Sequence, residues 1–175
     1  NVSQQRKGFI KDLFKGCNLS GDKKQLVDAC NFSSPEVRDF AIRVAGNSPG
    51  TFNLGQICDI FDQCFTNWKY VNDPKGENYI AKASETILNN FNGDCDDFAV
   101  LVCSSIMSIG GESRISYAYK GKTGHAFSEV NLGNTPQEII TDYLIKRYKL
   151  KTVNGKRDNS GNWWLNLDWF GGYPG

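Results

Sequence analysis

Apolar residues recur at helical spacing through the first two thirds of the chain. After Ser34 and Pro35, which suit an N-cap and a first helical position, they fall three and four residues apart as far as Gly46 and predict a helix over 34–45. The same spacing predicts a second helix over about 54–68 and a short one over 81–89. The first 33 residues are polar and irregular, with a short helix expected near 7–15.

Residues 95–109 form the most apolar helical segment of the chain. Two adjacent stripes of apolar residues cover most of the circumference of this predicted helix, a pattern typical of a helix buried on all sides. Gly110 and Gly111 end it. We therefore expect this helix to lie at the centre of the core.

Beyond residue 113 the pattern changes from helical spacing to alternation, which predicts strands over 114–119 and 125–132 with a hairpin loop at 120–124. A helix from Thr135 to Tyr148, a polar loop over 154–161 and a last strand over 163–169 follow. Helices first, then an antiparallel sheet with one inserted helix, predict an α+β fold. Within it we expect an N-terminal helical extension, residues 1–50, packed on a core of residues 51–175.

Length and composition fit one globular domain: 175 residues, 39% hydrophobic and 22% charged. The formal net charge is +1, and no long basic run is present, so the chain lacks the signature of a nucleic-acid-binding protein. No apolar stretch approaches the roughly 18 residues that a membrane-spanning helix needs. Nothing in the sequence indicates an oligomeric state.

Six cysteines are many for a cytosolic domain and few for a disulfide scaffold. Cys58 and Cys64 lie on one predicted helix, about 9 Å apart along its axis, which exceeds the ~7 Å limit for a disulfide. Cys17 and Cys30 fall in the irregular N-terminal segment and can pair with each other or with that helix. The cysteine content favours an extracytoplasmic location, and we expect a leader to be absent from this chain.

Cys95 is the candidate nucleophile, because it falls at the start of the buried helix. Unpaired backbone N–H groups and the helix dipole favour a thiolate there, and Gly93 permits a close approach to the helix. Neighbouring Asp94, Asp96 and Asp97 act against a thiolate. Activation therefore also needs a nearby imidazolium. If Cys95 is free, at least one more cysteine is unpaired, and Cys103 in the apolar helix is the natural candidate.

His125 is the only histidine, so any histidine-dependent chemistry must use it, and sites that need two histidines are excluded. It follows Gly124 at the start of a predicted strand. A third group is needed to hold the imidazole in one tautomer. We assign this role to Asp168, which lies on the polar face of an otherwise apolar strand and would be costly there without a partner.

Three segments carry a resemblance to a known family: 93–99 (G-D-C-D-D-F-A), 124–130 (G-H-A-F-S-E-V) and 164–168 (W-L-N-L-D), preceded by 68–74 (W-K-Y-V-N-D-P). In this order and spacing, they resemble the core of the transglutaminase-like superfamily over roughly residues 50–170. The resemblance implies a papain-like α+β fold with Cys95 as nucleophile, His125 as general base and acid, and Asp168 as the residue that orients the imidazole. No cofactor or metal ion is implied.

The chain departs from animal transglutaminases, since it is far shorter, lacks their flanking β-domains and has Phe127 where the family often has Trp. Their calcium dependence and glutamine-to-lysine crosslinking are therefore not carried over. We expect hydrolysis of an amide bond in a protein or peptide, as in a peptidase or amidase. Crosslinking is the alternative if an amine reaches the thioester before water. The helix at 136–148 resembles an insertion, and we expect it to serve packing.

Two further interpretations belong to other classes of protein. A non-catalytic binding module on the same fold would bury an unreactive Cys95 and use the C-terminal aromatic residues, which are Trp163, Trp164, Trp169, Phe170 and Tyr173, as a ligand surface. Strand alternation favours core packing for the inward-facing members of this set. A calcium site built from Asp94, Asp96 and Asp97 is the other interpretation, although their spacing does not match the EF-hand loop.

Overall fold

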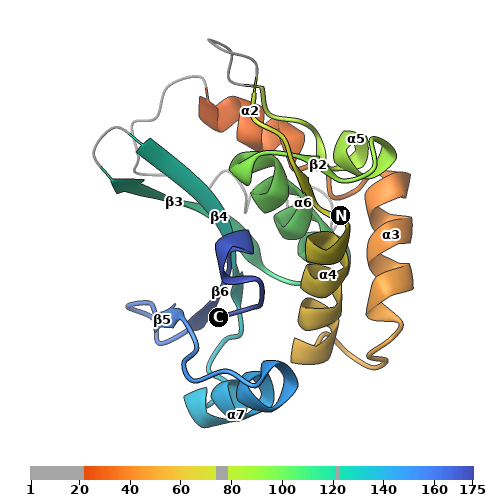
Figure 1. The fold of residues 1–175 in the computed structure, drawn as a ribbon. Coiled ribbons are helices and arrows are strands. Elements are labelled where there is room, and N and C mark those ends of the chain that lie inside the picture. Colours follow the sequence, from red (N-terminus) through yellow and green to blue (C-terminus); the bar gives the residue numbers. More distant parts are fainter. Residues whose placement is uncertain (1–21, 74–78, 121–122) are drawn as a thin grey trace.

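A computed structural model describes residues 22–73, 79–120 and 123–175. A layer of helices covers one side of a curled antiparallel sheet (Figure 1). The first elements are α2 (Asp22–Ala29), α3 (Pro35–Ala45), α4 (Leu54–Asn67), β1 (Lys69–Tyr70), α5 (Ala83–Leu88), β2 (Asn92–Gly93) and α6 (Cys95–Ser108). The remaining ones are β3 (Ser113–Lys120), β4 (Thr123–Asn131), α7 (Gln137–Tyr148), β5 (Gly155–Arg157), β6 (Trp163–Leu167) and the 3₁₀ turn η1 (Trp169–Gly171).

The helix starts follow local capping chemistry. The Ser34 side chain accepts a hydrogen bond from the backbone N–H of Val37, and Pro35 occupies the first turn of α3. At α4, Asn53 and Gln56 form a reciprocal capping box that the hydrophobic pattern alone did not indicate. The four helices predicted over 34–109 are present, each with bounds within two residues of the expected ones.

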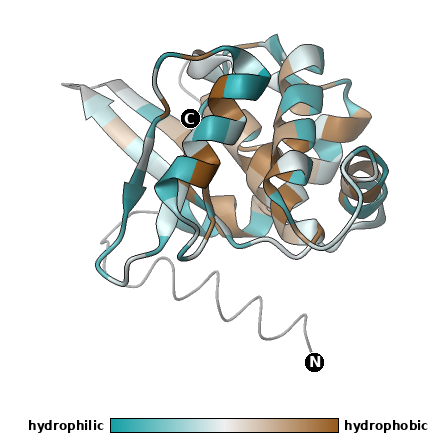
Figure 2. Cartoon of the chain, turned by 90° about the horizontal axis from the view of Figure 1, so that it is seen from below, coloured by the Kyte–Doolittle hydropathy of each residue, from teal (hydrophilic) through white to brown (hydrophobic). Residues whose placement is uncertain are grey.

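Helix α6 lies at the centre of the core, as its apolar circumference predicted. Every residue from Asp96 to Met107 is buried. One side of α6 packs with α3, α4, α7 and β6, and the other packs with α2 and β3. In Figure 2 hydrophobic residues gather where the helices face one another, and hydrophilic ones face outward. The helix that carries Cys95 is therefore held rigidly from both sides.

The sheet has the strand order β3-β4-β6-β5, with all neighbours antiparallel. β4 lies between β3 and β6, so the strand that carries His125 is paired on both edges. The mixed helix and sheet arrangement confirms the predicted α+β class.

Three predictions about elements were wrong. The strand expected over 163–169 ends at Leu167, because Asp168 instead caps the 3₁₀ turn η1 through the backbone N–H of Phe170. Residues 22–29, expected to be irregular, form α2, because Leu26 and Ala29 pack against α6 and tertiary burial outweighs a weak local pattern. The loop expected at 154–161 contains the edge strand β5, all of whose residues are exposed. Pairing with β6 and the close approach of Gly155 to the Trp163 ring define β5, and neither is visible in a polar sequence.

The five described cysteines, which are Cys30, Cys58, Cys64, Cys95 and Cys103, are all free thiols. The Cys58 and Cys64 thiols are buried without a disulfide, as the helical spacing required. Cys103, expected to be unpaired, is likewise free and buried. Cys17 and the helix expected at 7–15 lie outside the described residues.

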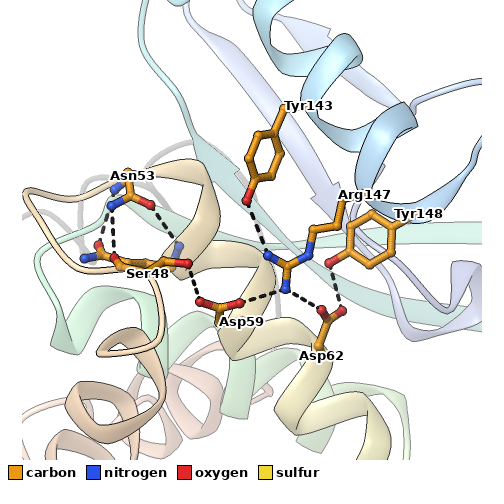
Figure 3. A network of polar contacts seen from close by, with 8 residues as sticks. Ser48, Asn53, Asp59, Asp62, Tyr143, Arg147 and Tyr148 are labelled. Atoms are coloured by element: carbon orange, nitrogen blue, oxygen red, sulfur yellow. Dashed lines mark hydrogen bonds and ion pairs between the residues drawn. The ribbon is translucent and has the colours of Figure 1, made fainter.

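Helix α7, between the His125 and Asp168 strands, packs as expected: Ile140 and Leu144 are almost completely buried. Arg147 fastens this helix to α4 through bonds of 2.7 Å to both Asp59 and Asp62 (Figure 3). Tyr148 adds a hydrogen bond of 2.8 Å to Asp62. No helix in the described part of the chain is long and apolar enough to span a membrane.

Candidate active site

Cys95 is the first residue of α6, and the backbone around it is set by its neighbours. Asp94 is the N-cap: its carboxylate accepts from the backbone N–H of Asp96 at 3.1 Å, while its own N–H donates to Asp97 at 3.1 Å. Gly93 has a φ of 154°, and a Cβ at this position would lie 2.3 Å from an Asp97 oxygen. Glycine is therefore required for Asp97 to close the turn that presents Cys95.

His125 and Asp168 form a hydrogen-bonded pair. The imidazole Nε2 lies 2.9 Å and 2.8 Å from the two Asp168 carboxylate oxygens, and both side chains are about one-fifth exposed. His125 is held in β4, and Asp168 follows β6, its paired neighbour in the sheet. Asp168 also accepts from the backbone N–H of Phe170 at 3.1 Å, which fixes the carboxylate. Nε2 is thus occupied, and among the described residues Nδ1 makes no hydrogen bond.

The Cys95 side chain is half-buried and faces β4 next to His125. The backbone N–H of Ala126, one residue beyond His125, interacts with the Cys95 sulfur, and so does the N–H of Cys95 itself. No direct hydrogen bond joins Cys95 to His125 among the described residues. The structure thus places Cys95 against β4, the strand that carries His125, and pairs His125 with Asp168.

Electrostatics around Cys95 favour the neutral thiol at rest. Burial raises the pKa of Cys95, the Asp94 and Asp96 carboxyls raise it further, and the two backbone N–H groups only partly offset this. The helix start alone therefore does not ionise the sulfur. The raised pKa agrees with the expectation that the neighbouring carboxylates act against a thiolate. The need for an imidazole stays a prediction.

Three carboxyl groups meet at the start of α6. Asp94, Asp96 and Asp97 each offer an oxygen within 4.8 Å of the others and can together hold a metal ion. Burial, followed by the neighbouring Asp94, raises the pKa of Asp96 to about 8, and burial raises that of Asp97 to about 6. Calcium binding stays an alternative interpretation of this cluster. If the cluster holds calcium, added calcium will raise the melting temperature and a chelator will reverse the increase.

Aromatic rings frame the His125–Asp168 pair. Phe170 lies edge-on to His125 with ring centroids 4.8 Å apart, Trp169 stacks on Phe170 at 4.7 Å, and Tyr70 stacks on Trp169 at 5.0 Å. The sequence reasoning did not single out Tyr70. The only signal for it was its place in the 68–74 segment of the resemblance.

The C-terminal aromatic residues do not form one ligand surface. Trp163 is buried, as strand alternation favoured for the inward-facing set. Trp164 is buried as well, although alternation places it on the opposite face, whereas Phe170 is 71% exposed. Trp164 packs on the other face of the sheet, where the Arg114 guanidinium lies 3.7 Å from its ring centroid. The binding-module interpretation therefore loses two of the aromatic side chains on which it relied.

A helix that begins with a cysteine and packs on an antiparallel sheet bearing a His–Asp pair defines a papain-like class of cysteine-dependent protein. The model of the transglutaminase-like superfamily matches residues 38–168, and the chain belongs to this family. Membership supports a cysteine-dependent enzyme.

A solved structure of a candidate cysteine protease from Cytophaga hutchinsonii is similar at 21% sequence identity and a TM-score of 0.47. The similarity covers 65% of this chain and 39% of the Cytophaga protein, so this chain corresponds to less than half the length of the Cytophaga protein. The sequence matches none of the curated proteins with which it was compared.

Proposed function

We propose that this protein hydrolyses amide bonds in proteins or peptides through a thioester on Cys95, with His125 as general base and acid and Asp168 as the orienting carboxylate. The observation that carries the proposal is the pair of contacts, 2.8 Å and 2.9 Å, between His125 Nε2 and Asp168. This pairing leaves Nδ1 for the thiol and holds the imidazole in one orientation.

The proposed reaction begins from a neutral thiol, because burial and carboxylates raise the pKa of Cys95. His125 Nδ1 takes the thiol proton as the sulfur attacks the carbonyl carbon, and the C=O electron pair moves to oxygen. The C–N bond then breaks as Nδ1 returns the proton to the departing amine. Water, deprotonated by Nδ1, attacks the thioester, the C–S bond breaks, and the free acid leaves.

Hydrolysis is favoured over crosslinking because the described residues around Cys95 include no feature dedicated to a lysine side chain. Cys95 and the His125–Asp168 pair are all partly exposed, so water reaches the thioester. The alternative is transfer of the acyl group to an amine. Product analysis with a glutamine-containing peptide and a primary amine separates the two, since transfer gives an N-substituted glutamine side chain and hydrolysis gives a free carboxylic acid.

Substitution of Cys95 by Ala tests the proposal. We expect complete loss of labelling at residue 95 by iodoacetamide and complete loss of amidase activity on a casein-derived peptide mixture. Cys58→Ala is the matched control, because Cys58 is fully buried in α4 and burial raises its pKa to about 12. Amidase activity that survives in the Cys95→Ala variant rules out Cys95 as the nucleophile.

A further inference from the structure

The proposed reaction places negative charge on the substrate carbonyl oxygen, and one donor for that oxygen is evident. Cys95 is the first residue of α6, so its backbone N–H donates to no backbone carbonyl within the helix. Papain-like chemistry gains most when two donors meet the oxyanion, because removal of one typically slows the reaction 10²–10³-fold. The second donor must therefore come from an element beside the start of α6.

Strand β1 is that element. It pairs in parallel with β2, in the register Tyr70↔Gly93, two residues before Cys95. Two backbone bonds of 2.8 Å, from Lys69 N–H to Phe91 and from Val71 N–H to Gly93, bracket Tyr70 and fix its backbone. This parallel pairing places Tyr70 beside the turn that presents Cys95.

The Tyr70 ring is held across the site from its other side. It stacks on Trp169 with centroids 5.0 Å apart at 27°, and Trp169 immediately follows Asp168. Tyr70 therefore connects the Cys95 side of the site with the His125–Asp168 side. Its side chain is half exposed, and its hydroxyl makes no hydrogen bond to any described residue.

The surroundings of Tyr70 favour its protonated hydroxyl. Burial raises the pKa of Tyr70, and so do the neighbouring Asp94, Cys95, Asp96 and Asp73 groups. The hydroxyl therefore keeps its proton at neutral pH and can only donate to an incoming anion.

We propose that the Tyr70 hydroxyl is the second oxyanion donor, acting with the backbone N–H of Cys95. This inference rests on the proposed function. As the Cys95 sulfur forms its bond to the carbonyl carbon, the C=O electron pair moves to oxygen, and the Tyr70 O–H donates a hydrogen bond to it without transferring the proton. When the carbonyl re-forms, the hydrogen bond weakens and the leaving group departs.

Two probes separate this role from a structural one in the full chain. Alkylation of Cys95 by iodoacetamide displaces iodide at a saturated carbon and forms no oxyanion, whereas acylation by p-nitrophenyl acetate passes through one. For Tyr70→Phe, which keeps the ring stacked on Trp169, we expect acylation to slow roughly 100-fold and alkylation to change less than about twofold. Tyr79→Phe is the matched control and should leave both rates unchanged, because Tyr79 is exposed and its hydroxyl faces Glu85.

The outcomes separate the two proposals. Equal acylation rates in Tyr70→Phe and the unmodified protein overturn the role of Tyr70 and leave Cys95 as nucleophile. A parallel fall in acylation and alkylation also overturns it, since Tyr70 would then act on the thiol itself. A nitrophenolate burst that persists in Cys95→Ala removes the proposed function and the Tyr70 inference together.

Discussion

Among the described residues, carboxyl groups are paired with a cation in one region of this molecule and lie together without a cation in another. Between α4 and α7, Asp59 and Asp62 share the Arg147 guanidinium, and Tyr148 donates to Asp62 (Figure 3). At the start of α6, Asp94, Asp96 and Asp97 meet with no ion pair to any described residue, and one buried Asp96 oxygen has no hydrogen-bond partner.

The comparison distinguishes carboxylates that stabilise the fold through an ion pair from carboxyl groups that, in the described part of the chain, are buried without a cation. At the α4–α7 contact, hydrogen bonds to Asp59 and Asp62 raise the pKa of Arg147 although burial acts to lower it, so the cation and its partners stabilise each other. At α6, burial and like charge raise the pKa of Asp96 to about 8. Carboxyl groups with raised pKa values beside a candidate nucleophile are typical of functional sites.

Substitution of Asp168 should have the largest effect on the reaction rate, because this carboxylate is paired only with the sole histidine. Asp168→Asn should lower the acylation rate by about 10⁴-fold while the protein stays folded, since the amide removes the charge and favours the wrong imidazole tautomer. Asn can still cap η1 through Phe170. Stopped-flow acylation by p-nitrophenyl acetate measures the effect. A loss smaller than about tenfold would show that Asp168 only packs against His125.

Removal of the Arg147 cation should lower the stability of the protein and leave its reaction rate unchanged. Arg147→Ala leaves the mostly buried Asp59 with only its Ser48 hydrogen bond, and we expect a loss of about 2 kcal/mol, equivalent to a fall in melting temperature of roughly 5 °C. Lys146→Ala, an exposed neighbour on α7, is the control and should change the melting temperature by less than about 1 °C. Equal effects of the two variants would show that the Arg147 network contributes nothing beyond surface charge.

Substitution of a carboxyl group in the Asp94, Asp96 and Asp97 cluster should raise stability, whereas loss of Arg147 lowers it. The pKa of Asp96 rises from 3.8 to about 8 on folding, so the folded state holds a proton that the unfolded chain has released. The contribution of Asp96 to the free energy of unfolding is fully present below pH 3.8 and is lost as the pH rises through about 8. Asp96→Asn mimics the protonated acid, so the variant should be more stable than the unmodified protein by several kcal/mol above pH 8 and should differ little from it at pH 4. Melting temperatures are measured for both proteins across this pH range. A difference between them that does not change with pH would contradict the raised pKa of Asp96.

Much of this architecture was readable from local patterns. The spacing from Val37 to Val44 and the apolar circumference of residues 95–109 predicted α3 and α6, because helices are specified by contacts within a few residues. The α2 helix and strand β5 were missed, because each depends on a partner distant in sequence: α6 for the first and β6 for the second. The candidate residues Cys95, His125 and Asp168 followed from order and resemblance, not from any distance.

Residue order and spacing alone determined the helices α3 to α7, the two alternating strands around a tight hairpin and the choice of the only histidine as base. Tertiary packing decided the rest. It brought Asp168 within 2.8 Å of His125 across 43 residues, placed Tyr70 beside the Cys95 turn, and raised the pKa values of Cys95 and Asp96. Protonation depends on how much water and opposite charge surround a group, and in this chain that environment is assembled from segments far apart in sequence.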